Sequence, residues 1–408
     1  MQKRDKSQYG NQKNLSVQHY LINMLHKILK TLDEKSDKKS MAVILQMIDW
    51  SQAFDRLDHT LGIQSFIENG VRPSLIPILI SFFQNREMKV KCKGLLSSPR
   101  ALPGGGPQGG TLGIEEYLSQ SNDNTDFLDQ DEKFKFIDDL STLEIINLIS
   151  IGLASYNYHS HVPSDIAADN LYLDSRNIKS QGYLQKLENW TENKQMKLNT
   201  KKSNFMIFNF SNNYQFNTRF NLNGTKIDQI HETKLLGLKI RDDLTWKSNT
   251  EMLTKKAYMR MIIIKKLVKF NVPMGELVQI YILYIRSIVE QYASVWHSSI
   301  TVGEKNDLER TQKVALRIIF GNSYTSYNDA LKWTGLETLA ARRTRLCLNF
   351  ARKCAKYEKT KDMFPLNDAL VDTRHREQYE VTNAKTDRLA KSSIPYMQRL
   401  LNSNCKTR

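Results

Sequence analysis

Asp49, Asp138 and Asp139 are the acidic residues whose setting most favours chemistry. Asp49 directly follows a nearly continuous apolar run at 41–48, and the other two lie side by side about ninety residues later, inside the short stretch 134–143. Clustered carboxylates repel one another and are costly to hold together without a cation. Mg²⁺ takes oxygen ligands and would remove that cost. The three residues therefore predict a divalent-metal site, provided that the two segments meet.

Each aspartate alone also has an ordinary explanation. An Asp after a strand usually caps a turn or the next helix, and paired Asp residues favour turns. Convergence would instead permit two-metal chemistry, in which one ion activates an attacking hydroxyl and the other stabilises the leaving group. The choice between the two depends on the elements that carry these residues.

Short strands are predicted on both sides of the site. The length and β-branched content of 41–48 indicate a buried strand, and 134–143 indicates two strands folded at the Asp pair. If these strands are neighbours in one sheet, the carboxylates converge. The other elements that we expect nearby are a helix at 51–61 ending near Gly62, a half-exposed strand at 88–93, a hairpin turn at Asn223-Gly224 and a strand at 235–240.

The character of the chain changes near Trp246. Strand signals end there, and long amphipathic helices are predicted at roughly 248–269, 275–297, 303–320 and 336–357, with a final helix near 384–402. This shift is the best sequence indication of a domain boundary.

Composition favours a polyanionic partner. The 408 residues carry a net charge of +16 and are 40% hydrophobic, which allows a large core. A basic but otherwise ordinary globular protein is the alternative. The four cysteines lack zinc spacing, the N-terminus lacks an apolar leader, and no apolar run is long enough to cross a bilayer. We expect a soluble intracellular protein of the cytoplasm or nucleus, not secreted and without a membrane partner.

Six segments in order resemble the reverse transcriptases of LINE-type (non-LTR) retrotransposons. They surround the first aspartate, a Pro-Gln-Gly loop, the aspartate pair, the segment after it, a primer-grip region and a later helix, at 47–59, 103–113, 136–139, 190–208, 234–246 and 284–296. The resemblance covers residues 8 to about 355. It also implies an N-terminally truncated chain, because less sequence than usual precedes Gln8-Tyr9-Gly10.

The resemblance implies a role for each matching residue. Asp49 and Asp138 would ligate two Mg²⁺ ions (with Mn²⁺ as a substitute), Asp139 would complete the acidic cluster, and the carbonyl of Trp50 would be a further ligand. Phe54 would exclude the ribose 2′-hydroxyl. The remaining roles fall to Gln108 and Gly109, which would contact the nucleotide and template, and to Lys202, or the adjacent Lys201, as proton donor to pyrophosphate.

Ordinary explanations stay open for these residues as well. Phe54 could simply pack in the core, the loop around Gln108 could be a flexible connector, and Lys202 could be a solvated surface lysine.

The implied fold is α+β, a right-hand polymerase. Partial fingers and a palm with an antiparallel sheet would occupy 1–245, an all-helical thumb or connection 246–360, and a charged tail with a helix 361–408. The implied activity is RNA-directed DNA synthesis, with an RNA template, a DNA primer and deoxynucleoside triphosphates as partners. Two alternatives remain: a catalytically inactive, truncated remnant that only binds nucleic acid, and an RNA-templated RNA polymerase, against which Phe54 argues.

Overall fold

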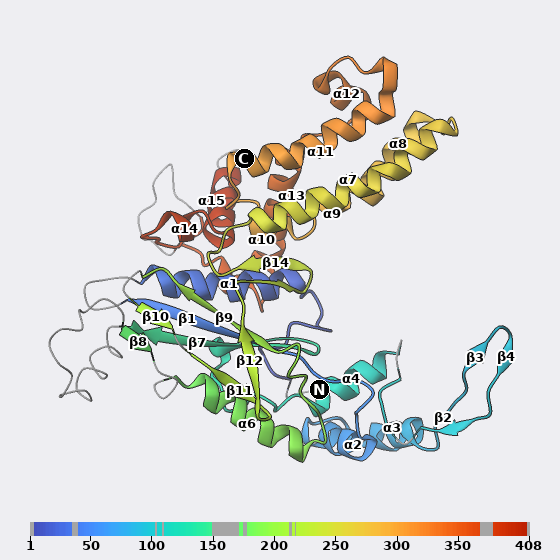
Figure 1. Ribbon diagram of the computed structural model, residues 1–408, viewed down its shortest axis with the longest axis vertical. Coiled ribbons are helices and arrows are strands. Elements are labelled where there is room, and N and C mark those ends of the chain that lie inside the picture. Colours follow the sequence, from blue (N-terminus) through green and yellow to red (C-terminus); the bar gives the residue numbers. More distant parts are fainter. Residues whose placement is uncertain are drawn as a thin grey trace. The chain divides into compact units, whose positions relative to one another are not determined.

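The computed structural model (Figure 1) describes most of the chain. The described residues are 4–34, 40–102, 104–107, 110–148, 171–173, 178–211, 214–216, 218–367 and 378–405. The chain divides into two compact units. The first comprises Met1–Tyr20 and Glu34–His231, and the second comprises Leu21–Asp33 and Glu232–Arg408.

A six-stranded sheet is the framework of the first unit, in the order β11-β12-β9-β1-β7-β6. Its central strand β1 (Met41–Ile48) lies between β7 (Asp139–Asn147) and β9 (Asn204–Asn209) and is antiparallel to both. Seven of the eight β1 residues are buried, which confirms the predicted buried strand. β12 (Thr225–Gln229) is instead parallel to β9. On its other side β12 forms an antiparallel hairpin with β11 (Phe220–Leu222).

One face of this sheet packs on helix α6 (Ser180–Asn193). Ile44 and Ile48 of β1, Ile207 of β9 and Leu187 of α6 share one buried hydrophobic cluster. Burial of such side chains contributes roughly 1.5–3 kcal/mol each, so this contact fixes the register of β1.

The first unit also contains short helices and hairpins. These are η1 (Pro73–Leu75), α2 (His59–Glu68), α3 (Ile76–Phe83), β2 (Glu87–Met88), β3 (Lys91–Cys92), β4 (Leu95–Leu96), β5 (Arg100–Ala101), α4 (Thr111–Gln120), η2 (Gln130–Glu132), β6 (Lys133–Phe136), β8 (Leu171–Leu173) and β10 (Tyr214–Phe216). The β6–β7 hairpin folds at the Asp pair, and the β11–β12 hairpin turns at Asn223-Gly224, so both turn predictions are confirmed.

The predicted helix at 51–61 is wrong. Residues 51–57 form turns, and α2 begins only at His59, because the Asp58 carboxylate accepts hydrogen bonds from the N–H groups of Thr60 and Leu61. The helix then continues through Gly62 instead of ending there. A Cβ on Gly62 would lie 2.9 Å from Glu116 Oε1, so this glycine permits close packing of α2 and α4.

The predicted half-exposed strand at 88–93 is also wrong. Every side chain from Glu87 to Ala101 is exposed, including Val90 at 59%. The chain reverses at Lys93-Gly94, where both φ angles are positive, and β2 to β5 form a ribbon that extends beyond α3 (Figure 1). Since neither face is covered, the apolar–basic alternation does not mark burial here.

The second unit is mainly helical. Its elements include most of α1 (Val17–Asp33), together with β13 (Glu232–Leu235), β14 (Leu238–Arg241), α7 (Lys247–Lys269), α8 (Met274–Ile280), η4 (Tyr281–Arg286), α9 (Ser287–Val289), α10 (Ala293–Trp296), α11 (Val302–Phe320), η5 (Gly321–Ser323), α12 (Tyr327–Thr334), α13 (Leu339–Lys356), η6 (Lys361–Met363), α14 (Asp387–Ala390) and α15 (Ser393–Cys405). The predicted helices at 248–269 and 303–320 are confirmed as α7 and α11.

Two predictions in this unit are corrected. The expected strand at 235–240 is a hairpin, because Leu236 and Gly237 both adopt positive φ and reverse the chain. The expected helix at 275–297 is broken into α8, the π-helical η4, α9 and α10, with Tyr292 at φ +52° before the last piece. Over the part of the chain that the structure describes, no helix has the length and apolar character needed to cross a membrane.

Candidate active site

Strand pairing brings the three aspartates together where the neighbouring strands β1 and β7 meet at one end. Ile48 pairs with Leu140 in the β1–β7 ladder, so Asp49 leaves β1 beside Asp139, the first residue of β7. Asp138 lies in the two-residue turn just before it. The two segments that carry the acidic residues are therefore neighbours.

Electrostatics shows that the carboxylates affect one another. Burial raises the pKa of Asp139 to about 6, helped by the charges of Asp138 and Asp49. Burial, and then the charge of Asp49, also raises the pKa of Asp138. Among the described residues, no Lys or Arg forms an ion pair with any of the three. The cluster is thus short of positive charge.

The loop after α6 holds Asp49. Asn199 donates from Nδ2 to Asp49 Oδ2 at 2.9 Å and from its backbone N to the Asp49 carbonyl at 2.8 Å. The backbone N of Asp49 donates to Ser203 Oγ at 3.1 Å. Neither Asn199 nor Ser203 was predicted from the sequence. Their only signal was position, since both fall in the segment that resembles the motif after the aspartate hairpin.

Trp50 is anchored in the core. Its ring is 6% exposed and stacks edge-on against Trp190 at 5.6 Å between centroids, while its backbone pairs with Leu198. The side chain therefore serves packing, and only the backbone carbonyl of Trp50 is available for the expected role.

The donor set suits a hard cation, with one qualification from geometry. In the described ranges, no three His, Cys, Asp or Glu side chains lie together as a ready metal cluster. The three neighbouring carboxylates nevertheless offer oxygen ligands and unbalanced negative charge, which is what Mg²⁺ requires, and neighbouring acidic charge helps to raise the pKa of Asp138 and Asp139. The residues fit the ion by chemistry, and their side chains would have to turn toward a common point.

Phe54 lies beside the glycine-rich loop. Its ring packs on Tyr117 at 5.1 Å between centroids, and its carbonyl accepts a hydrogen bond from Gly106 N at 2.7 Å. The half-buried ring contacts the main core cluster, as the ordinary explanation requires, but is not enclosed by it.

The glycine-rich loop docks by its backbone. Gly105 N donates to the Leu57 carbonyl at 2.8 Å, and a Cβ on Gly104 would lie 2.8 Å from that same oxygen. Only glycine permits this approach. Gln108 and Gly109 lie outside the described residues, so the structure gives no account of them.

Tyr117 is influenced by the charge of the aspartates and was not predicted from the sequence. It lies on α4, is 1% exposed, and has a pKa raised first by burial and then by the charge of Asp138. Its only signal was its place on the helix directly after the glycine-rich loop.

Lys202 lies in the same turn that holds Asp49. Its backbone N donates to the Asn199 carbonyl at 3.2 Å, and its side chain is exposed, as is that of Lys201. The structure therefore places Lys202 near the Asp49 segment without a contact that selects it over Lys201.

Two curated relatives are transposon polymerases. The chain is 25% identical over 243 residues to a probable RNA-directed DNA polymerase from transposon BS of Drosophila melanogaster, covering 60% of this chain and 25% of that protein. It is 32% identical over 101 residues to the RNA-directed DNA polymerase from mobile element jockey of Drosophila funebris, covering 25% of this chain and 11% of that protein. Over these stretches the chain is similar to RNA-directed DNA polymerases of LINE-type transposons. It spans a quarter or less of the length of these two polymerases.

Solved structures of telomerase overlap weakly with this chain. Apo telomerase from Candida tropicalis gives a TM-score of 0.39 at 13% identity, covering 86% of this chain and 51% of the other. Telomerase from Candida albicans in complex with a telomeric RNA fragment gives 0.34 at 11%, covering 88% and 54%. These overlaps are too low to bear on the fold. No protein-family model matches the sequence.

The second unit carries a basic helix face. Leu253, Ala257, Met261 and Ile264 form the buried side of α7. Six lysines on the same helix are exposed, and we call four of them, Lys255, Lys256, Lys265 and Lys266, the α7 lysines. The pKa of Lys256 is lowered, first by partial burial and then by Lys234 and Arg260, so positive charge is crowded here.

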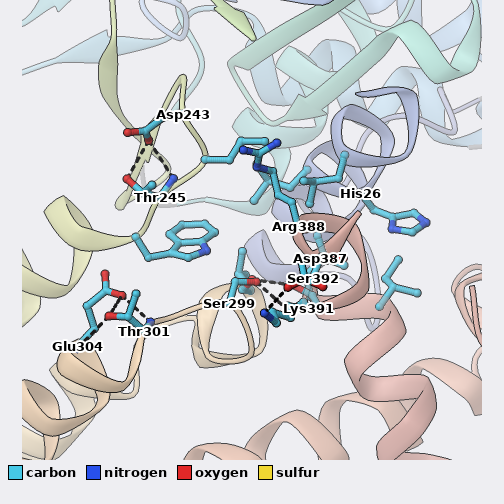
Figure 2. Close-up of a pocket in the computed structure, with 18 residues that line it drawn as sticks. His26, Asp243, Thr245, Ser299, Thr301, Glu304, Asp387, Arg388, Lys391 and Ser392 are labelled. Atoms are coloured by element: carbon cyan, nitrogen blue, oxygen red, sulfur yellow. Dashed lines mark hydrogen bonds and ion pairs between the residues drawn. The ribbon is translucent and has the colours of Figure 1, made fainter. Parts of the chain in front are cut away.

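The second unit also encloses a cavity of about 270 Å³ (Figure 2). Its polar groups serve local structure: Thr301 and Glu304 form the capping box of α11, and Asp387 pairs with Lys391 at 2.7 Å. None of the site residues predicted from the sequence lines it, so we assign it no part in the chemistry.

Proposed function

We propose that this chain is an RNA-directed DNA polymerase that adds deoxynucleotides to the 3′-hydroxyl of a primer and releases pyrophosphate. One observation carries the proposal: the antiparallel pairing of β1 with β7, which puts Asp49 beside the Asp138–Asp139 turn. The similarity to transposon RNA-directed DNA polymerases supports this choice of chemistry. The net charge of +16 suits an RNA template and a DNA primer.

The acidic residues would hold two Mg²⁺ ions, or Mn²⁺ in their place. Asp49 and Asp138 would bind both ions, Asp139 would complete the negative cluster, and the Trp50 carbonyl would add an oxygen. When bound, the ions supply charge stabilisation to the attacking and leaving oxygens. Asn199 would fix the Asp49 carboxylate, so that one oxygen is held and the other is free to bind.

The remaining residues would select and orient the nucleotide. The Phe54 ring, braced by Tyr117, would overlap a ribose 2′-hydroxyl and so favour deoxynucleoside triphosphates. Gln108 and Gly109 would contact the nucleotide and template; the nearby Gly106 donates a hydrogen bond to the Phe54 carbonyl. Lys202 would donate a proton to the departing pyrophosphate.

The domain roles follow the same scheme. Residues 1–245 would form partial fingers and a palm, of which the six-stranded sheet is the centre. Residues 246–360 would form a helical thumb or connection, in which the α7 lysines contact the phosphates of the template–primer duplex. Residues 361–408 would be a charged tail that ends in α15.

Primer extension on an RNA template with Mg²⁺ tests the proposal. Wild-type chain should extend the primer, and Asp138→Asn should lower the rate at least about a hundredfold, because loss of a metal ligand removes several kcal/mol of charge stabilisation. Asp228→Asn removes an equal charge from the exposed strand β12 and should leave the rate unchanged. Template binding without extension in the wild type would instead indicate a nucleic-acid-binding remnant.

Nucleotide choice separates DNA synthesis from RNA synthesis in the same assay. Deoxynucleotides should be incorporated well and ribonucleotides poorly. Equal use of both, or a preference for ribonucleotides, would identify an RNA-templated RNA polymerase.

A further inference from the structure

The aspartate turn contains a residue in an unfavourable conformation. Ile137 is the first of the two residues between β6 and β7, and its φ is +58°. A β-branched residue rarely adopts positive φ, and such backbone strain costs on the order of 1–3 kcal/mol. Glycine is the usual residue at this position of a tight turn. Some other part of the chain must therefore hold Ile137 in place.

The side-chain amide of Gln8 forms hydrogen bonds with both the backbone N–H and the carbonyl of Ile137. Ile137 N donates to Gln8 Oε1 at 2.9 Å, and Gln8 Nε2 donates to the Ile137 carbonyl at 3.3 Å. Gln8 Oε1 also accepts from Gly10 N at 2.8 Å. Gln8 is only 4% exposed, so water cannot readily take over these hydrogen bonds.

Gln8 is itself fixed to the neighbouring strand. Lys135 N of β6 donates to the Ser7 carbonyl at 3.0 Å, and Tyr9 N donates to the Lys135 carbonyl at 2.8 Å. Asp5 forms a buried ion pair with Lys135 Nζ at 2.7 Å, each side chain being 4% exposed. The segment 5–10 therefore runs along β6 and presents Gln8 to the turn.

Gly10 completes the contact because it has no side chain. A Cβ on Gly10 would lie 2.5 Å from Ile137 Cγ1 and 2.6 Å from Ile137 N. The second of these neighbours is backbone and cannot move aside without moving the turn. The segment 5–10 thus fits the turn only in its present shape.

We propose that Gln8 and Gly10 form a clamp that holds the strained turn and so keeps Asp138 and Asp139 beside the end of β1 that carries Asp49. The clamp rests on the proposed function, because it positions the residues to which that function assigns the metal ions. Gln8 is a positioning residue and touches no reacting atom. Without it, Ile137 relaxes toward negative φ, the two carboxylates rotate with the turn, and the metal ions lose their ligands.

Gln8→Ala tests the clamp, and Gln181→Ala is its matched control. Gln181 brackets Asn221 of β11 in the same manner, accepting from its N at 2.8 Å and donating to its carbonyl at 2.9 Å. Both variants lose two side-chain hydrogen bonds to one backbone residue, and Gln8→Ala also loses the one from Gly10 N. We expect hydrogen exchange at the Ile137 amide to accelerate at least tenfold in Gln8→Ala, and Mn²⁺ affinity to fall at least tenfold. Gln181→Ala should change neither.

A second substitution tells positioning from general loss of stability. Ile137→Gly accepts positive φ without strain, so the double variant Gln8→Ala, Ile137→Gly should recover most of the Mn²⁺ affinity. Its extension rate at saturating primer–template should recover as well, because kcat, not KM, carries the defect. Gly10→Ala should lower Mn²⁺ affinity too, with little rescue by Ile137→Gly, since the close backbone N remains.

The outcomes separate the clamp from the proposed function. Unchanged Ile137 exchange in Gln8→Ala, Mn²⁺ affinity equal to that of the wild type, or no recovery in the double variant would each overturn the clamp. Failure of the wild type to extend primers would count against the proposed function alone, because exchange at Ile137 is measured without metal or substrate.

Discussion

Replacing Asp139 with Asn should stabilise the metal-free protein at pH 8. The carboxyl of Asp139 is held near Asp138 and Asp49, and burial together with these charges raises its pKa from 3.8 to about 6. The folded chain therefore binds this proton more tightly than the unfolded chain does. The resulting stability is present below about pH 4 and is lost as the pH rises through about 6. Asn stays neutral and avoids the repulsion.

The size of the effect follows from the same rise in pKa. A change from 3.8 to about 6 corresponds to about 3 kcal/mol at full strength. Asp139 is partly exposed, so solvent screening reduces this to roughly 1–2 kcal/mol. For a unit of this size that is an increase in Tm of about 3–6 °C.

Thermal unfolding in EDTA at pH 4 and at pH 8 measures the effect. Asp139→Asn should raise Tm at pH 8 and change it little at pH 4. The exposed control Asp228→Asn should leave Tm almost unchanged at both pH values. Adding Mg²⁺ should stabilise the wild type more than the variant, because the ion binds only the folded state. A lower Tm for Asp139→Asn at pH 8 without metal, or an equal gain at both pH values, would refute the reasoning.

Three further predictions concern other parts of the chain. Phe54→Val should lower discrimination against ribonucleotides about 10–100-fold in single-nucleotide incorporation, because the ring no longer fills the space of the 2′-hydroxyl. Unchanged discrimination would show that Phe54 only packs in the core. Replacing the α7 lysines with Gln should weaken binding to an RNA–DNA duplex and reduce the dependence of log K on log salt by up to about 4, whereas an unchanged slope would remove α7 from the interface. Asp58→Ala should cost about 1 kcal/mol in urea unfolding by removing the cap of α2, and a neutral result would contradict the capping geometry.

Burial and turn chemistry made part of the fold predictable from the sequence. The apolar run of β1 and the Asn223-Gly224 turn specify local structure strongly, and both are confirmed. The periodicity of α7 and α11 also located these helices well, since each buries one continuous stripe of side chains. The roles of Asp49, Asp138 and Asp139 stay predictions, although strand pairing places these residues side by side at the ends of β1 and β7.

Features that depend on contacts distant in the sequence were not predictable. The grip of Gln8 on Ile137 joins residues 129 positions apart, and nothing near either one announces it. The spacing of apolar residues predicted that the helix begins near Ser51, but the Asp58 cap sets the start of α2 at His59. In the ribbon at 87–101, the alternation of apolar and basic residues at 88–93 predicted a half-exposed strand. No described element covers either face, so the whole ribbon is exposed.

The most direct test of the account is to locate bound Mn²⁺ by anomalous diffraction from crystals of the whole chain soaked in that ion. We predict density between the carboxylates of Asp49 and Asp138, with metal–oxygen distances of about 2.0–2.2 Å, and its loss in Asp138→Asn crystals. Mn²⁺ bound only elsewhere, or none at this edge at millimolar concentration, would contradict the claim that β1 and the β6–β7 turn form a metal-dependent active site.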